Sequence, residues 1–354
     1  MRKRGLSTIV TTLILILLVF VAIGIVWGVV KNVLNEGKEN INMNFITSNF
    51  EIQKVKILEH GLNVSVKRDS GEGEMGGLRF IISNGVNSNT TDWEGNISEF
   101  QTITLPLQYD GIVKKISVAP FVKTKKGKLK LGNIQDSLEF SDEEVIENFP
   151  GIVSWWSFDG SGQDLVGGNY ATMIGSLDYV DSKFGKAVNL SDGSTNYFYV
   201  ESQDNSLNIT KNLSIEAWIK PESNFSMLLD KIHSGETYLI GFFDDPNPAE
   251  KKVQAKFKTR IGNFNSEIGK IKENEWNHVV ITYSSNSGNI SFYKNGVLNN
   301  SFLHSYPGEL NSTNGTLWIG QYTSGSALLD DLRIYNTTLT PNQVAGLYHL
   351  NPSV

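Results

Sequence analysis

The adjacent carboxylates Asp330 and Asp331 are the residues of this sequence whose chemistry is hardest to satisfy. They lie near the C-terminus, in a segment whose composition is typical of a β-strand. In an extended strand, Asp330 shares one face with Leu332 and Ile334, and Asp331 points to the opposite face. Because the two aliphatic residues are expected in the core, the charge of Asp330 points inward and needs a partner. That partner is either a hard cation or a set of hydrogen-bond donors from the backbone or from Arg333.

Glycoside hydrolysis would need two carboxylates that face one sugar ring. Alternate positions of one strand would meet this need, but no Glu-x-Asp-x-(x)-Glu run occurs in the sequence. Asp330 and Asp331 are adjacent and are therefore predicted to lie on opposite faces. Asp244 and Asp245 fall in a proline-rich loop, where a turn is the simpler interpretation. We therefore predict no catalytic residues and no enzymatic activity.

Other catalytic patterns are also missing from the sequence. None of the five histidines is paired at the spacing of zinc ligands, and no Gly-x-Ser-x-Gly or phosphate-binding glycine loop occurs. His278 follows Trp276 by two residues and is predicted to be a packed structural residue. Trp93, Trp155, Tyr306 and Tyr322 could form platforms for sugars, but ordinary packing under a loop is the better explanation for each of them. The sequence points to binding rather than catalysis, without selecting a binding face.

The first thirty residues predict a membrane anchor. Arg2, Lys3 and Arg4 precede Gly5, and an apolar run of about 22 residues extends from position 9 to position 30, enough for a helix of roughly 33 Å. The preceding cations favour a cytoplasmic N-terminus, which would place the rest of the chain outside the cell. We therefore expect a single-pass location in the cell membrane, with the membrane as a partner and residues 6–40 forming the transmembrane helix and its extension.

The order of cations, Gly5 and Leu6 resembles the class III signals of archaeal pilins and archaellins, which are cut after the glycine. The resemblance implies processing between Gly5 and Leu6, removal of residues 1–5 as a leader, and pilin-like self-assembly. The acidic residue common at the fifth mature position of bacterial pilins is replaced by Val10. A plain, uncleaved anchor with residues 1–5 as a basic N-terminus remains the alternative.

Composition limits the partners of the chain. The net charge is −6, or −9 once the three cations at positions 2–4 are subtracted, so nucleic acid is an unfavourable partner. There are no cysteines, so disulfides cannot stabilise the fold. Asn-x-Ser/Thr sequons are dense, which favours an exported glycoprotein, although polar loops also favour these residue types. The candidate acceptors are Asn63, Asn89, Asn96, Asn189, Asn208, Asn212, Asn224, Asn289, Asn299, Asn311, Asn314 and Asn336.

Beyond the apolar run, the sequence predicts an all-β chain. Residues 45–142 carry short segments of alternating apolar and polar residues, as in Leu62, Val64 and Val66, and about seven such strands predict an immunoglobulin-like β-sandwich. The acidic segment 141–144 is predicted to be a linker.

Residues 150–350 resume the strand pattern with more aromatic residues and predict a two-sheet jelly roll. Six short motifs occur in one order across this region, and together they make it resemble the LamG-like, concanavalin A-like jelly-roll family. The motifs are Trp156-Ser-Phe-Asp159, Lys183-Phe-Gly-Lys-Ala-Val188, Leu213-Ser-Ile-Glu-Ala-Trp-Ile-Lys-Pro221, Trp276-Asn-His-Val279, Tyr293-Lys-Asn-Gly296 and Leu329-Asp-Asp-Leu-Arg-Ile-Tyr335.

The resemblance implies a sandwich fold, frequent Ca²⁺ binding and recognition of glycans or proteins. In relatives of this fold, a structural calcium ion lies between the terminal strands and a loop. Here the resemblance implies a Ca²⁺ site made by Asp159, Asp330 and a loop carbonyl near Gly193. Hydrogen bonding of Asp330 without a metal remains the alternative.

These expectations combine into a membrane-anchored surface protein, with pilin-like character, that displays a LamG-like domain for adhesion to an extracellular glycan or protein. A structural filament or envelope subunit without a specific ligand is the first alternative. A membrane-tethered glycoside hydrolase is the second.

Overall fold

The computed structural model describes residues 49–350 apart from 59–60, 72–74, 124–128, 192–193, 203, 224–226, 232–236, 312–314 and 322–324. Of residues 1–48, it describes only Val19, Val26, Trp27 and Lys31. The predicted processing site at Gly5 and Leu6 lies outside the described residues.

The predicted transmembrane helix and the single-pass membrane location are corrected by the structure. Within the part of the chain that the structure describes, no helix combines the length and the apolar character that crossing a bilayer requires. The helices α2 (Asp142–Glu147) and α3 (Pro341–Tyr348) contain 6 and 8 residues. At about 1.5 Å per residue they reach only about 9 and 12 Å, well short of a hydrocarbon layer of about 30 Å. The remainder of the predicted fold class, an all-β chain built from sandwiches, is confirmed.

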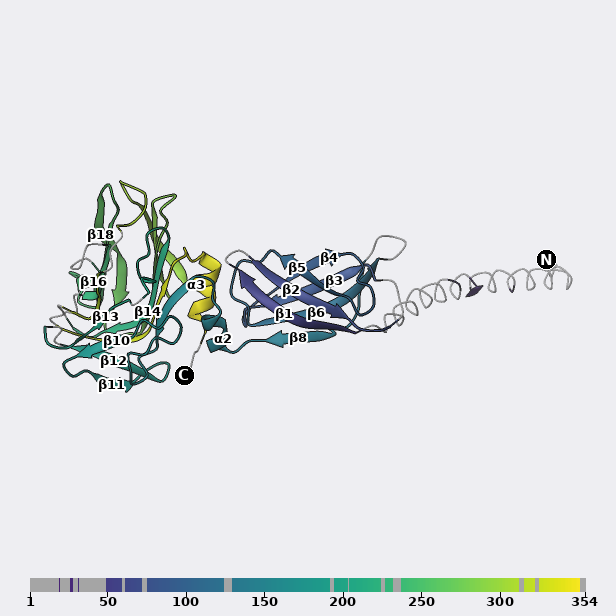
Figure 1. The fold of residues 1–354 in the computed structure, drawn as a ribbon, viewed down its shortest axis with the longest axis horizontal. Helices are drawn as coiled ribbons and strands as arrows, with labels where there is room; N and C mark the ends of the chain where they lie inside the picture. Colours follow the sequence, from purple (N-terminus) through teal and green to yellow (C-terminus); the bar gives the residue numbers. More distant parts are fainter. Residues whose placement is uncertain are drawn as a thin grey trace, which may run out of the picture.

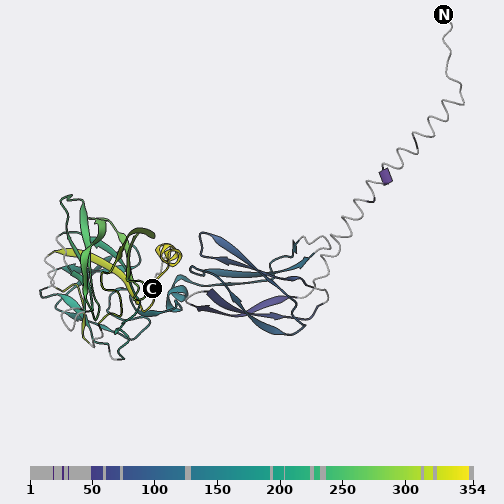
Figure 2. The ribbon, with the colours of Figure 1, turned by 90° about the horizontal axis from the view of Figure 1, so that it is seen from above.

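The N-terminal sandwich packs a three-stranded sheet against a five-stranded sheet, and the two layers are separated in Figure 2. Alternation explains this packing: Leu62, Val64 and Val66 are buried, while the residues between them are half-buried. The smaller sheet has the order β1 (Phe50–Leu58), β2 (Gly61–Arg68), β5 (Thr102–Leu107). The larger sheet has the order β4 (Ser88–Glu94), β3 (Gly77–Ser83), β6 (Lys115–Lys123), β7 (Leu129–Leu131), and β8 (Asp136–Glu139) also pairs with β6.

The C-terminal sandwich contains a seven-stranded and an eight-stranded sheet (Figure 1). The seven-stranded sheet has the order β10 (Ala171–Ile174), β13 (Tyr197–Val200), β22 (Leu317–Ile319), β15 (Met227–Asp230), β16 (Tyr238–Asp244), β17 (Glu250–Lys258), β18 (Asn263–Lys272). The eight-stranded sheet has the order β11 (Asp178–Asp181), β12 (Lys186–Ser191), β23 (Ser326–Tyr335), β14 (Leu213–Pro221), β19 (Asn277–Tyr283), β20 (Asn289–Lys294), β21 (Val297–Leu303), with β9 (Ile152–Trp156) on β23.

The first and last strands of this sandwich are neighbours, as the resemblance to the jelly-roll family implied. β9 pairs antiparallel with β23, with Trp156 opposite Leu332. A hydrophobic core that includes Trp156, Phe198, Ile215 and Leu332 fills the space between the two sheets. The motif residues around Asp159 and Asp330 are therefore carried on adjoining parts of one sheet.

The segment 141–144, predicted to be an acidic linker, instead forms the N-cap and the first turn of helix α2. Ser141 accepts a hydrogen bond from the Glu144 amide, and the Glu144 side chain accepts one from the Ser141 amide. This reciprocal pair is a capping box, which satisfies two otherwise unpaired backbone donors. Helix α2 lies between the two sandwiches in Figures 1 and 2.

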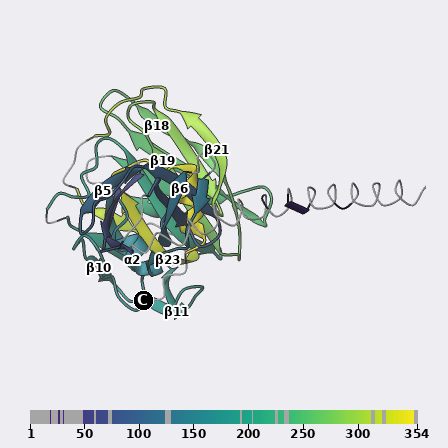
Figure 3. The same cartoon turned by 90° about the vertical axis from the view of Figure 1, so that its right-hand side faces the viewer.

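The two sandwiches share a hydrophobic cluster, which we call the interdomain core. Figure 3 shows them stacked along the long axis, with β5 and β6 in front of β19 and β23. Strand β14 and its neighbours use one face for the jelly-roll core, so their outer face is free to contact this cluster. The interdomain core consists of Ile112, Val145, Ile146, Phe149, Trp155, Val280, Tyr293, Tyr335, Leu339, Val344, Leu347 and Leu350.

Candidate functional site

A backbone irregularity in β23 places both predicted carboxylates on the outer face of the eight-stranded sheet. The pairing of β14 with β23 shifts register between Glu216 and Trp218, and Asp331 has a φ of 51°. Asp330 stands opposite Trp218, which is flanked by core residues and therefore points outward. Asp331 contacts Arg333 on the same outer side. The predicted alternation, with Asp330 inward beside Leu332 and Asp331 on the opposite face, is therefore wrong, because the bulge inserts an extra residue.

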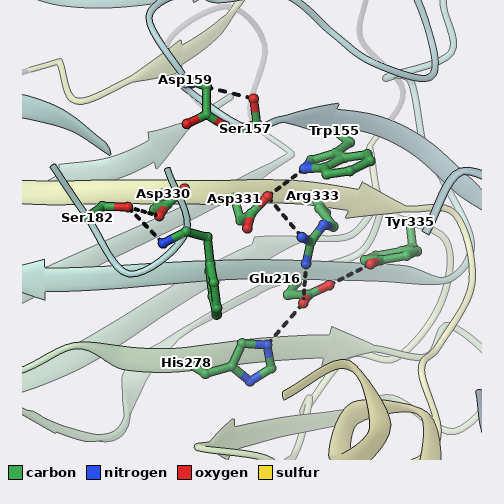
Figure 4. A network of polar contacts seen from close by, with 11 residues as sticks. Trp155, Ser157, Asp159, Ser182, Glu216, His278, Asp330, Asp331, Arg333 and Tyr335 are labelled. Carbon is green, nitrogen blue, oxygen red and sulfur yellow. Dashed lines mark hydrogen bonds and ion pairs between the residues drawn. The ribbon is translucent and has the colours of Figure 1, made fainter. Parts of the chain in front are cut away.

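Glu216 on β14 belongs to a buried polar network, and both of its carboxylate oxygens have partners there (Figure 4). Its Oε1 accepts a hydrogen bond from Arg333 Nη1 at 2.7 Å and lies 3.0 Å from His278 Nε2, and its Oε2 accepts one from the Tyr335 hydroxyl at 2.5 Å. Burial raises the pKa of Glu216, but the attraction of Arg333 and the bonds from His278 and Tyr335 outweigh it and lower the pKa to about 2. His278 is fully buried here, which agrees with the predicted structural role.

Asp330 and Asp331 form the other end of this network, and each has an oxygen without a donor. Asp330 Oδ2 accepts a hydrogen bond from the Ser182 hydroxyl at 2.6 Å, and Asp331 Oδ1 accepts one from Trp155 Nε1 at 2.7 Å. Asp330 Oδ1 and Asp331 Oδ2 are buried and have no hydrogen-bond partner among the described residues. Burial, followed by the charge of Asp331, raises the pKa of Asp330 to about 8. Burial also raises the pKa of Asp331 to about 6, against the attraction of Arg333.

The turn that follows β11 links Asp330 to Asp159. Ser182 donates to Asp330, and the Lys186 amide donates to Asp159 Oδ1 at 2.5 Å. Gly185, between them, has a φ of 73°, and a Cβ at this position would clash with Asp159 Oδ1. The charge of Asp159 contributes to the raised pKa values of Asp330 and Asp331. The structure thus brings two of the three predicted metal ligands to one short turn, whereas Gly193 lies outside the described residues.

Side chains alone do not complete a metal site in the described part of the chain. No group of three or more His, Asp or Glu residues there is arranged to hold a metal ion. What the site offers is two buried carboxylate oxygens without donors, the kind of hard ligand that Ca²⁺ prefers. Any Ca²⁺ bound there would need further oxygens from backbone carbonyls.

The predicted glycosylation sites differ in exposure. Asn89, Asn96, Asn299 and Asn336 are exposed, as an acceptor must be. Asn224 and Asn314 lie outside the described residues. The half-buried sites are Asn63, Asn189, Asn208, Asn212, Asn289 and Asn311.

A cluster of aromatic side chains on the outer face of the seven-stranded sheet was missed by the sequence analysis. Tyr197 and Tyr199 on β13 and Trp318 on β22 are half-buried, with ring centroids 5.4 Å apart for Tyr197 and Trp318 and 6.2 Å apart for Tyr199 and Trp318. The sequence pattern indicates this cluster in part: Phe198 lies between the tyrosines and faces the core, so Tyr197 and Tyr199 point to the opposite face. By contrast, Trp155 is buried in the interdomain core.

Comparisons with known proteins agree with this architecture. Residues 192–345 match the family model described as the concanavalin A-like lectin/glucanases superfamily, which is less than half of the chain. No curated protein matches. The family match and the two-sheet topology together give the C-terminal sandwich a LamG-like, concanavalin A-like jelly-roll fold.

Solved structures with a similar arrangement include binding domains. The binding domain of Paraclostridial Mosquitocidal Protein 1 is 18% identical over 56% of this chain and 52% of its own, with a TM-score of 0.47. Domain 4 of AbnA, a GH43 extracellular arabinanase from Geobacillus stearothermophilus solved with arabinotriose, is 23% identical over 56% of this chain and 98% of its own, with a TM-score of 0.44. The botulinum neurotoxin serotype D binding domain is 14% identical over 56% and 51%, with a TM-score of 0.45. The chain spans about half the length of the mosquitocidal protein's binding domain.

Proposed function

We propose that the C-terminal sandwich is a non-catalytic glycan-binding domain whose contact surface is the aromatic cluster of Tyr197, Tyr199 and Trp318. The observation that carries the proposal is the position of this cluster on the outer face of a sheet. Aromatic rings bury the apolar face of a sugar, because the negative face of the ring attracts the sugar C–H groups. The match to a family that is named for lectins and glucanases supports the same conclusion.

The second sheet of the domain is a less suitable surface for a glycan. Its outer face contacts helix α3 and the N-terminal sandwich through the interdomain core. The edge-to-face contact between Tyr197 and Trp318, at an interplanar angle of 65°, fixes both rings before a ligand arrives. The seven-stranded sheet therefore offers a prepared surface.

Burial argues against hydrolysis at the two carboxylates that share a face. The exposed fractions of Asp330 and Asp331 are 0% and 2%, so no sugar ring can lie between them. Their raised pKa values follow from burial and do not require a catalytic role.

The test uses the full chain on a glycan array, followed by calorimetry with the glycan that binds most strongly. Trp318→Ala is expected to weaken binding several-fold, up to about tenfold, since one aromatic contact contributes on the order of 0.5–1.5 kcal/mol beyond its buried area. Tyr306→Ala is the control, because Tyr306 is an exposed aromatic residue outside the cluster. Binding that Trp318→Ala leaves intact would disprove the proposed surface, and sustained release of reducing sugar would disprove the non-catalytic role.

We also propose that Asp330 and Asp159 bind Ca²⁺ together with backbone carbonyls. Two observations support the proposal: Asp330 Oδ1 is buried without a donor among the described residues, and the charge of the nearby Asp159 helps to raise the pKa of Asp330. A bound Ca²⁺ would add positive charge beside Asp330, since Arg333 pairs with Asp331 and Glu216. The chain itself holds Asp330 through Ser182 and Asp159 through the Lys186 amide.

Melting of the full chain in Ca²⁺ and in EDTA tests this second proposal. Ca²⁺ is expected to raise the melting temperature by several degrees, because it binds only the folded state. Asp330→Asn should abolish this response, whereas Asp181→Asn, an exposed carboxylate on β11, two strands away from β23, should keep it. An equal Ca²⁺ response in the protein and in Asp330→Asn would rule out the site.

A further inference from the structure

A cleft of about 650 Å³ opens between the two sandwiches, away from the aromatic cluster. Three segments far apart in the sequence line it: part of β4, the residues that follow β5, and the start of α3. The volume falls within the range of about 300–1,000 Å³ that is usual for small-ligand sites, and such sites often occur at domain junctions. The lining residues include Thr90, Thr91, Gln108, Tyr109 and Asn342.

Strand β4 meets the cleft with its edge. Asn89, Thr90 and Thr91 are consecutive and all line the cleft. Neighbouring side chains of a strand point to opposite faces, so three in a row can line one space only if the strand is seen edge-on. Because β4 is an edge strand of its sheet, the backbone groups on its outer side have no strand partner in the described chain. The wall of the cleft thus adds backbone donors and acceptors to the side chains.

The chemistry of the cleft suits a neutral, hydroxyl-rich ligand. Its side chains are hydroxyls and amides, apart from the Asp110 carboxylate, and no lysine or arginine is among the described residues that line it. Asp110 accepts hydrogen bonds across the domain boundary, from Thr340 Oγ1 at 2.6 Å and from Asn342 Nδ2 at 3.3 Å. Without a cation, the cleft disfavours an anion. The Tyr109 ring provides a flat surface, held in place by a 3.0 Å bond from its hydroxyl to the Ile112 carbonyl.

We propose that this interdomain cleft is a second binding site, for a neutral oligosaccharide. The site exists only when both sandwiches are in place, and the interdomain core holds them together before the ligand arrives. It does not depend on the aromatic cluster, so it goes beyond the function proposed above.

An extended peptide added to the edge of β4 is the competing occupant. The geometry favours the sugar, because the cleft takes in only three of the seven residues of β4. Strand addition would use more of the edge and would need apolar pockets for alternate side chains. The lining residues provide hydrogen-bonding groups instead.

The experiment is calorimetry of the full chain with neutral trisaccharides (maltotriose, cellotriose and arabinotriose) and with the trisaccharide of galacturonic acid. All variants carry Trp318→Ala, so that binding at the aromatic cluster is weakened. A neutral trisaccharide is expected to bind in this background, and the acidic one at least tenfold more weakly. Gln108→Ala and Asn342→Ala should each weaken binding about five- to tenfold, the effect of one lost hydrogen bond. Thr90→Trp should abolish binding by filling the cleft.

Gln53→Ala and Thr102→Trp are the matched controls, since both residues are exposed in the same sandwich and neither lines the cleft. If Trp318→Ala alone removes all binding, the inference is overturned and the proposed function stands. If the cleft variants bind as well as the controls, or the acidic trisaccharide binds more tightly, the cleft is not a neutral-sugar site. A loss of binding in Gln108→Ala and Thr90→Trp, with both controls intact, supports the inference.

Discussion

Glu216 and Asp330 are both completely buried on the outer face of one sheet, yet the pKa of Glu216 is lowered to about 2 and that of Asp330 is raised to about 8. Glu216 faces Arg333, His278 and Tyr335, whereas Asp330 has the Ser182 hydroxyl and one oxygen without a donor. Burial alone would raise both pKa values, so the donors decide the outcome. Both oxygens of Glu216 therefore have partners within the fold, whereas Asp330 Oδ1 has none among the described residues and can be stabilised by a proton or a cation.

The largest effect is expected from removing the charge of Glu216. Glu216→Gln removes one of the two carboxylates that pair with Arg333, and we expect a loss of about 3–5 kcal/mol in the free energy of unfolding. Urea unfolding measures it. Glu222→Gln is the control, because Glu222 pairs with Lys220 at the surface and should contribute less than about 1 kcal/mol. Similar losses in the two variants would mean that the buried network is not special.

The pH dependence of stability should come chiefly from Asp330. In EDTA, unfolded Asp330 releases its proton near its ordinary pKa of 3.8, but the folded protein keeps it up to about pH 8. The folded state therefore binds more protons between these values, so the free energy of unfolding falls as the pH rises from about 4 to about 8. One pKa unit corresponds to about 1.4 kcal/mol, so a fall of a few kcal/mol is expected.

Asp330→Asn should flatten this decline, leaving only the smaller contribution of Asp331, whose pKa is raised to about 6. Asp181→Asn, at an exposed site, should follow the unmodified protein. Identical pH profiles for the protein and Asp330→Asn would contradict the assignment of Asp330 as the unsatisfied group.

A smaller effect is expected at the turn that joins Asp330 to Asp159. Gly185→Ala combines an unfavourable positive φ with a clash against Asp159, and we expect a loss of about 2–3 kcal/mol in thermal unfolding. Gly168→Ala has a φ of 77° with no atom near its Cβ, so it should cost only about 1 kcal/mol. Equal losses would show that contact with Asp159 does not constrain the turn.

The smallest effect concerns the single donor to Asp331. Trp155→Phe removes the indole N–H that binds Asp331 Oδ1 and should cost about 1 kcal/mol. Trp156→Phe removes a comparable bond, from the Trp156 indole to the Asn169 carbonyl. Only Trp155→Phe should raise the pKa of Asp331 further, detected by NMR of the carboxyl carbon. The same titration in both variants would mean that Trp155 does not control Asp331.

The sequence predicts the architecture better than the site. Spaced motifs such as Trp156-Ser-Phe-Asp159 predicted the jelly roll, because the order of the motifs reflects the order of the strands. The orientation of Asp330 and Asp331 could not be predicted, since it depends on one bulged residue that reverses the alternation. The network around Glu216 was also missed, because its partners are more than 60 residues away in sequence.

Two other misses had signals in the sequence. The pattern Ser141-x-x-Glu144 indicates a capping box, whereas the acidic composition of the segment indicated a linker. Tyr197 and Tyr199 flank Phe198, so alternation predicts two aromatics on one face, but their proximity to Trp318 required the sheet order. The membrane assignment shows the opposite problem, because an apolar run predicted a helix that the described residues do not contain.

The interdomain core has a practical consequence for anyone who divides this chain for expression. A fragment that begins at position 150 would lack Ile112, Val145, Ile146 and Phe149. The apolar surfaces of Trp155 and Tyr335 would then be exposed to solvent. Such a piece is expected to self-associate or precipitate, which would look like a folding defect of the jelly roll itself. A fragment that begins just upstream of Ser141 keeps Val145, Ile146 and Phe149 and lacks only Ile112, so polar substitutions would be needed only at the residues that Ile112 contacts.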